Sequence, residues 1–373
     1  MNVEQNYLSL LRQALWQTGP ELPVLSGEEL DELLALADCQ KTRGLIYDVL
    51  MNSGTELPRL TAKQMQRLLL NFSALHGKLD KALVRVVTVL RDAGIPAVLL
   101  KGQGVARYYP VPKLRECGDI DLYIGPDRLE DAVRTLTPIV DRMEDHLNGK
   151  HWNCWIGKAE IELHQHSMML PSRSLTRFYR TLEAEGFSRN LVTQDFDGVR
   201  VDTPEDTFNA FYLFFHAWHH FIGVGVGFRQ LCDWVLLLHG RGAHIDRDRL
   251  ERMIVGMKLL RAWQIFGCIA VHELALPQEE FPCYDARRFK ISRKVLALIL
   301  EEGNFARGFK PRRPRPKAYL AGMAHSFGLH VRRFFKTLRI DPAQTFRTFW
   351  STLFVGIAQF FRDLLSKLRH SRR

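Results

Sequence analysis

The sequence predicts an α+β fold in which helical segments precede and follow a small mixed core. Apolar residues recur at helical spacing over most of the first 92 residues and again between residues 203 and 302. Between these stretches, short apolar runs bounded by glycine, proline and aspartate predict strands. We therefore divide the chain into an N-terminal helical region (1–92), a mixed core (93–202), a second helical region (203–302) and a tail (303–373).

The first region is expected to consist of helices that end just before the core. Ser26 with Glu29 three residues later forms a capping box ahead of a leucine-rich stretch. Residues 61–91 continue with helical apolar spacing, and Gly94 and Pro96 end that helix. No apolar secretory segment is found at the start, and the six cysteines are scattered without a Cys-x-x-Cys pair. Reduced thiols and a cytoplasmic location are therefore expected.

The core is predicted to alternate strands and helices. In chain order we expect a buried strand at 97–100, the glycine turn Lys101-Gly102-Gln103-Gly104, a helix-like segment at 105–109, a strand at 119–124, a helix at 127–136, and strands near 152–156 and 160–164. Asp197-Gly198 predicts a hairpin turn between two more strands.

Asp119 and Asp121 form the candidate metal-binding pair. Side chains alternate along a strand, so both carboxylates project to one face while Ile120 enters the core. Two carboxylates facing one space suit a hard divalent cation, and Mg²⁺ is the obvious candidate. Asp-x-Asp spacing also occurs at 195–197 and 246–248, where a turn and a helix start explain it. A solvated strand face is the alternative interpretation of Asp119 and Asp121.

The glycine turn is a candidate phosphate-binding element. Gly102 and Gly104 lie between an expected strand and an expected helix, where backbone amides approach a phosphate without an intervening Cβ. Lys101 adds a positive charge. A tight turn that needs glycine for backbone reasons is the alternative.

Taken together, these residues resemble a known family, the uncharacterised nucleotidyltransferases of the polymerase-beta superfamily. The resemblance covers roughly residues 87–238, is strongest over 98–122, and fades in the tail. It rests on linked segments in the family's order: Leu99-Leu100-Lys101-Gly102, Leu114-Arg115, Gly118-Asp119-Ile120-Asp121-Leu122, Ile161-Glu162-Leu163-His164, and the His216–His220 segment followed by Asp233.

The resemblance implies a polymerase-beta-type core, a small mixed sheet with flanking helices, and a site that holds two Mg²⁺ ions. Its implied metal ligands are Asp119, Asp121 and a third carboxylate on a later strand, for which Glu162 fits and Glu160 competes. Its implied nucleotide contacts are Lys101, Gly102, Gly104 and Arg115.

Histidines form a second set of candidates. His216, His219 and His220 fall on one side of a helix, which favours a structural or nucleotide-contact role over zinc binding. His146, His151, His164 and His166 form another ambiguous group. Within that group, His164 is the best candidate for substrate contact, because it lies two residues beyond Glu162 on the same strand face; His216 and His220 are the further candidates.

The tail supplies the basic character of the chain. Residues 303–373 carry 16 lysines and arginines against two acidic residues, whereas the first 302 residues carry 36 basic and 39 acidic residues. Prolines within 307–317 predict an extended linker, and aromatic amphipathic segments follow at 331–340 and 345–368. The uncharged run between Arg347 and Arg362 is only 14 residues long, which is too short to span a membrane. The sequence leaves two roles open for the tail: an interfacial segment at the inner face of an anionic membrane, or packing on the body or on a second subunit. Nucleic-acid binding is less favoured, because no recognition motif accompanies the positive charge.

These features and the resemblance together imply Mg²⁺-dependent transfer of a nucleoside monophosphate from an NTP to a hydroxyl of a small molecule, for which a sugar or sugar phosphate is one candidate. Two alternatives remain. One is transfer to a protein side chain. The other is a catalytically inactive fold that serves as a binding or membrane-associated module.

Overall fold

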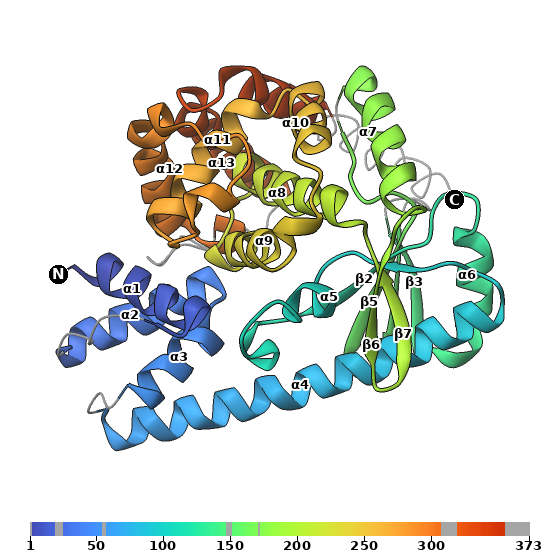
Figure 1. Ribbon diagram of the computed structural model, residues 1–373, viewed down its shortest axis with the longest axis horizontal. Helices are drawn as coiled ribbons and strands as arrows, with labels where there is room; N and C mark the ends of the chain where they lie inside the picture. The colour runs from blue at the N-terminus through green and yellow to red at the C-terminus, as the bar shows by residue number, and fades with distance from the viewer. Residues whose placement is uncertain are drawn as a thin grey trace.

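The computed structural model describes residues 2–18, 25–53, 57–146, 151–170, 172–306 and 319–354. Within these residues, seven strands form one mixed sheet, and helices from both ends of the chain lie beside it (Figure 1). The predicted α+β class is therefore confirmed.

The strands of the sheet are β1 (Val98–Leu99), β2 (Asp119–Tyr123), β3 (Arg142–His146), β4 (His151–Ile156), β5 (Ala159–His164), β6 (Val192–Phe196) and β7 (Val199–Thr203), in the order β3-β4-β5-β2-β1-β7-β6. β2 runs parallel to β5 and β1 runs parallel to β7, while the other neighbouring pairs are antiparallel. The predicted hairpin is confirmed: Asp197 and Gly198 join β6 to β7 with φ values of 50° and 83°, the positive angles that a two-residue hairpin turn prefers.

The chain begins with helices, as the apolar spacing predicts. They are α1 (Val3–Trp16), α2 (Gly27–Gln40), α3 (Arg43–Asn52) and α4 (Arg59–Asp92). The capping box at the start of α2 is confirmed, because the Glu29 backbone N–H donates to Ser26 and the Glu29 carboxylate accepts from the Ser26 backbone N–H. Gly94 follows α4 with a φ of 66° and turns the chain toward β1. α4 runs from the N-terminal helices to the sheet (Figure 1).

One face of the sheet is closed by the C-terminal half of α4 and by α6 (Leu129–Leu136). Ile120 and Leu122 of β2 lie in one buried cluster with Leu83 of α4. Because strand side chains alternate, Asp119 and Asp121 face the opposite side of β2. The burial of β2 on α4 thus fixes which way its carboxylates point.

The remaining helices are α5 (Gln103–Ala106), α7 (Arg173–Gly186), α8 (Asp206–Gly223), α9 (Phe228–Arg241), α10 (Arg247–Gly256), α11 (Leu260–His272), α12 (Phe289–Glu302) and α13 (Tyr319–Leu338). A buried cluster joins α1, α2 and α3 to α8, α9, α11 and α12. Gln40 illustrates the connection: its side-chain amide donates to the Ile299 carbonyl and accepts from the Phe228 backbone N–H. The N-terminal helices therefore share one core with the helices that follow the sheet strands in the chain.

The described part of the tail is helical. α13 is followed by helical residues 342–354, where Phe346, Trp350 and Phe354 are exposed. The predicted linker at 307–317 lies outside the described residues, as does the part of the second aromatic segment from 355 to 368. Among the helices of the described ranges, none is long and apolar enough to cross a bilayer.

Candidate active site

The strand register brings three carboxylates together. β2 and β5 pair in parallel, with Asp119 opposite Glu160 and Asp121 opposite Glu162. Asp119, Asp121 and Glu162 each offer one oxygen atom, and these atoms lie within 4.8 Å of one another. Glu160 instead accepts a hydrogen bond of 2.7 Å from the Asn153 side chain. Of the two candidates for the third carboxylate, the geometry favours Glu162.

The pKa values of the three carboxyl groups are shifted in different directions. The neighbouring carboxylate of Asp121, and then burial, raise the pKa of Asp119. Burial also acts to raise the pKa of Asp121, but Lys101 and His164 outweigh it and lower that pKa overall. Hydrogen bonding to His164 likewise lowers the pKa of Glu162 against the effect of burial. The group is therefore a partly buried anionic site, with Asp121 its most buried member and cationic side chains at its edge.

The carboxylates fit a hard divalent cation. Oδ2 of Asp121 is buried and has no hydrogen-bond partner among the described residues, although a buried oxygen of this kind is normally satisfied. Oxygen atoms gathered from several carboxylates are the donors that Mg²⁺ prefers. Asp121, with Asp119 and Glu162 beside it, thus presents an unsatisfied oxygen where such an ion would bind.

The glycine turn lies at the edge of this group. Nζ of Lys101 is 3.2 Å from Oδ1 of Asp121. Gly102 has a φ of 63°, and a Cβ there would approach the Asp119 carbonyl oxygen to 3.3 Å, so the turn needs glycine for backbone reasons. Gly104 packs against Thr203 of β7. The helix that follows differs from the expected 105–109: α5 covers Gln103–Ala106, a single turn that offers little helix dipole.

Arg115 lies in a buried ion pair. Its Nε and Nη2 atoms each lie 2.7 Å from a carboxylate oxygen of Asp233 on α9, and the Tyr109 hydroxyl donates to the same carboxylate. The Arg115 side chain is only 4% exposed. This arrangement fastens the segment before β2 to α9 and leaves the guanidinium engaged with protein groups.

His164 contacts two of the carboxylates. Its Nε2 atom is 3.0 Å from Oδ1 of Asp121 and 3.3 Å from Oε2 of Glu162. Burial opposes the charged form, but these hydrogen bonds raise the pKa of His164 to about 9. His164 is therefore a cation at neutral pH in this arrangement.

His216 and His220 approach the site from α8. Their Nε2 atoms are 3.3 Å apart. Burial, followed by the positive charge of Lys101, lowers the pKa of both histidines, that of His220 to about 3. Tyr212, one turn earlier on α8, has its pKa raised by burial and by the negative charge of Asp121, which places this helix on the acidic side of the sheet. The two histidines are thus neutral hydrogen-bonding groups.

Two further residues lie near the site: Arg229 was not singled out from the sequence, and His151 was named only within an ambiguous group of four histidines. Arg229, at the start of α9, donates to the Glu116 carbonyl at 2.9 Å, and its charge contributes to lowering the pKa values of His216 and His220. His151 on β4 lies opposite His164 on β5. Both residues are distant in sequence from Asp119 and Asp121. Only the strand register and the packing of α9 bring them to the acidic face.

The structure is therefore a mixed α+β fold whose sheet carries three neighbouring carboxylates on the face opposite α4. Residues 26–274, about two-thirds of the chain, match the family model described as "Uncharacterised nucleotidyltransferase", and the chain belongs to that family. The solved structures include a match to an antigenic nucleotidyltransferase-like protein from Paracoccidioides brasiliensis, at 11% identity and a TM-score of 0.33, over 43% of this chain and 75% of that one. No curated protein matches the chain.

Proposed function

We propose that this protein is a Mg²⁺-dependent nucleotidyltransferase with a polymerase-beta-type core, which moves a nucleoside monophosphate from an NTP to a hydroxyl group. The observation that carries the proposal is the approach of the Asp119, Asp121 and Glu162 oxygen atoms to within 4.8 Å in a chain of this family. Two Mg²⁺ ions held there would neutralise phosphate charge and assist deprotonation of the acceptor hydroxyl.

Cationic residues at the edge of the site are candidates to bind the triphosphate of the NTP. Lys101 already lies beside Asp121, and its ammonium is the nearest candidate for a phosphate oxygen. Gly102 and Gly104 form the turn that carries it. Arg229 is a further candidate, because its Nε atom is buried without a hydrogen-bond partner in the described part of the chain. Arg115 would act indirectly, by fixing the position of β2 through Asp233.

The histidines of α8 suit an acceptor that carries hydroxyl groups. Since their pKa values are lowered, His216 and His220 are neutral at physiological pH. One Nε2 atom donates to the other, so the pair keeps one ring nitrogen that accepts and one that donates a hydrogen bond. His164, in contrast, donates to the carboxylates and would position them. A sugar or sugar phosphate is the acceptor class we propose on this basis.

The proposed transfer is tested with NTPs labelled at the α-phosphate, incubated with the protein, Mg²⁺ and a cell lysate separated into small-molecule and protein fractions. Label in small molecules supports the proposed acceptor class, and label in protein supports the alternative of protein modification. The Asp119→Ala, Asp121→Ala double variant must lose the transfer. Glu160→Gln is the matched control, because Glu160 lies on the same strand face as Glu162 but pairs with Asn153.

A peripheral membrane location is a second proposal, carried by the exposed aromatic side chains of the tail. Phe335, Trp350 and Phe354 are 66%, 49% and 64% exposed. Aromatic side chains on a basic segment favour the interface of an anionic bilayer, where the ring is buried and the cations meet lipid headgroups. The tail would then hold the enzyme at the inner face of a membrane.

A further inference from the structure

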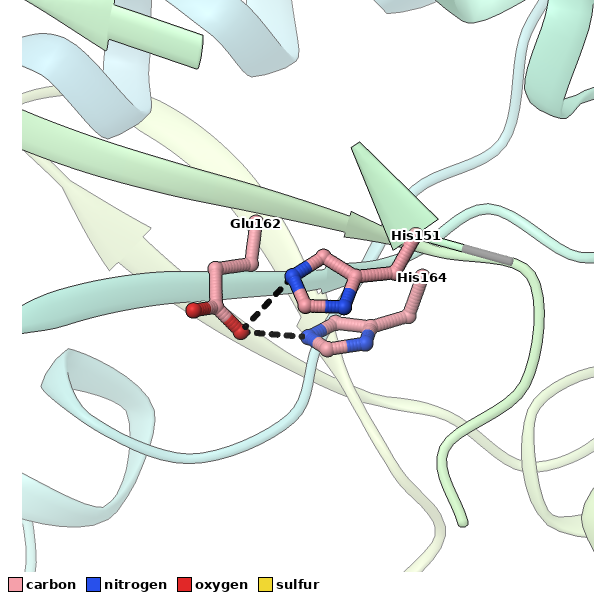
Figure 2. Close-up of side chains that lie close together, drawn as sticks. All are labelled: His151, Glu162 and His164. Atoms are coloured by element: carbon pink, nitrogen blue, oxygen red, sulfur yellow. Dashed lines mark ion pairs between the residues drawn. The ribbon is translucent and has the colours of Figure 1, made fainter. Parts of the chain in front are cut away.

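A second group of potential metal ligands adjoins the carboxylates. It consists of His151 from β4 with Glu162 and His164 from β5 (Figure 2). Each residue offers one ligand atom, and the three atoms lie within 4.8 Å of one another. Both histidine rings point toward the Glu162 carboxylate, as Figure 2 shows.

The His151 ring has a hydrogen bond to the Asn153 side chain, but no hydrogen bond within the described ranges holds its Nε2 atom. Its Nε2 atom is buried and lies 3.6 Å from Oε2 of Glu162, which is too long for a hydrogen bond. Within the described residues this nitrogen has no hydrogen-bond partner at all. The Nε2 atom of His151 is buried and faces the Glu162 carboxylate without bonding to it. A nitrogen that binds a metal ion shared with that carboxylate would have the same arrangement.

The distances are close to those of a coordinated ion. Ligands about 2.0–2.1 Å from a tetrahedral zinc ion lie roughly 3.3–3.4 Å from one another. The Nε2 atoms of His151 and His164 lie 3.6 Å and 3.3 Å from Oε2 of Glu162. Small side-chain rotations would bring the three atoms to one ion. His164 would release to solvent the Nε2 proton that it donates to the carboxylates, and the same nitrogen would then bind the ion.

The donor set differs from that of the neighbouring carboxylates. Two imidazole nitrogens and one carboxylate oxygen suit borderline transition metals such as Zn²⁺, Co²⁺ or Fe²⁺, whereas all-oxygen sites suit Mg²⁺. Three protein ligands also leave a coordination position free for water or a substrate oxygen. The same face of the sheet thus offers two sites of different chemical preference, with Glu162 common to both.

We propose that His151, His164 and Glu162 form a second divalent-cation site that selects a transition metal, next to the carboxylate site and joined to it through Glu162. An ion there ties β4 to β5 and fixes the oxygen of Glu162 that lies toward the histidines. The site shares Glu162 with the proposed transfer site, but the binding of an ion to it requires no nucleotide, so the two proposals can be tested separately.

The test is a titration of the metal-free, full-length protein with Co²⁺ in excess Mg²⁺, followed by the visible absorption of the bound ion. The wild-type protein is expected to bind Co²⁺ with bands typical of nitrogen ligation. His151→Asn should weaken this binding by at least about tenfold, given that even the loss of an outer-shell partner has that effect. His239→Asn, at an exposed histidine paired with Glu280, is the matched control and should bind as wild type does.

The carboxylate site is separated from the histidine site by Asp119→Asn. This variant should keep the Co²⁺ bands while it loses Mg²⁺-dependent NTP binding, so that failure of one proposal leaves the other measurable. Far-UV circular dichroism checks that each variant is folded. Equal Co²⁺ affinity in His151→Asn and wild type, displacement of Co²⁺ by Mg²⁺, or loss of the bands in Asp119→Asn would overturn the histidine site.

Discussion

Arg115 and Asp233 form a two-pronged ion pair that is almost completely buried, with two nitrogen-to-oxygen distances of 2.7 Å. The pair joins the segment that leads into the acidic strand β2 to helix α9 of the helical core. The segment before Asp119 and Asp121 is therefore held by a contact made outside the sheet.

Arg115→Met is expected to lower the free energy of unfolding by about 3–5 kcal/mol, because it leaves the Asp233 carboxylate buried without its cation. The double variant Arg115→Met, Asp233→Leu should recover much of that loss, since no buried charge remains. Urea denaturation of both variants measures the effect. A fully stable Arg115→Met protein that had lost only NTP affinity would instead show that the guanidinium contacts phosphate directly.

Stability should fall as the solution is acidified below about pH 6.5, because His216 and His220 are held neutral in the folded protein. The pKa of His220 is lowered to about 3 when folded, whereas an unfolded histidine takes up a proton near 6.5. The unfolded state then binds more protons between these values, so the free energy of unfolding decreases as the pH falls through that window.

His220→Gln should reduce this pH dependence, and melting temperatures between pH 8 and pH 5 measure it. His239→Asn serves as the control, because that histidine is largely exposed. If the melting temperatures of the His220→Gln and wild-type proteins decline in parallel as the pH falls, His220 is not a source of the pH dependence.

Gly102→Ala is expected to destabilise the protein by about 1–3 kcal/mol, because the backbone at Gly102 combines a φ of 63° with a ψ of −120°, a conformation strained for other residues. Gly77→Ala within α4 is the control: a Cβ there meets nothing within 4 Å, and alanine is the better helix former. Thermal melts compare the two. An unchanged melting temperature in Gly102→Ala would mean that the turn readily adopts another conformation.

The tail predicts a specific response to lipid. Replacement of Trp350 and Phe354 by serine should weaken binding to vesicles of anionic lipid at low salt by at least about tenfold, since burial of one large apolar side chain is worth roughly 1.5–3 kcal/mol. Leu60→Ser, at a side chain that is 75% exposed on α4, is the matched control. Vesicle co-sedimentation measures binding, and a wild-type protein that stays in the supernatant rules out the membrane proposal.

Local sequence patterns predicted the fold well where apolar residues define an element. The strands at β2 and β5, the capping box of α2 and the turn at Asp197 each follow from short-range chemistry. β3 was not predicted because Arg-Met-Glu-Asp-His carries almost no apolar alternation, as befits an exposed edge strand that gains its order from pairing with β4. α7, the other missed element, lies in a stretch to which no element was assigned.

The geometry of the candidate site could be predicted where its residues share one strand and not where packing assembles them. Alternation along a strand is enough to place Asp119 and Asp121 on one face and Glu162 beside His164. The sequence preferred Glu162 over Glu160 only through the family resemblance, and the hydrogen bond from Asn153 to Glu160 is a contact that no local pattern predicts. The approach of His151 depends on the register between β4 and β5, which no local pattern encodes.

The most direct test of the central claim is calorimetric titration of each NTP into the protein, with Mg²⁺ and with EDTA. We predict Mg²⁺-dependent binding of at least one nucleotide, loss of that binding in the Asp119→Ala, Asp121→Ala double variant, and retention in Glu160→Gln. Absence of NTP binding to the wild-type protein, or equal binding by the double variant, would contradict the claim that these carboxylates form a nucleotidyltransferase site.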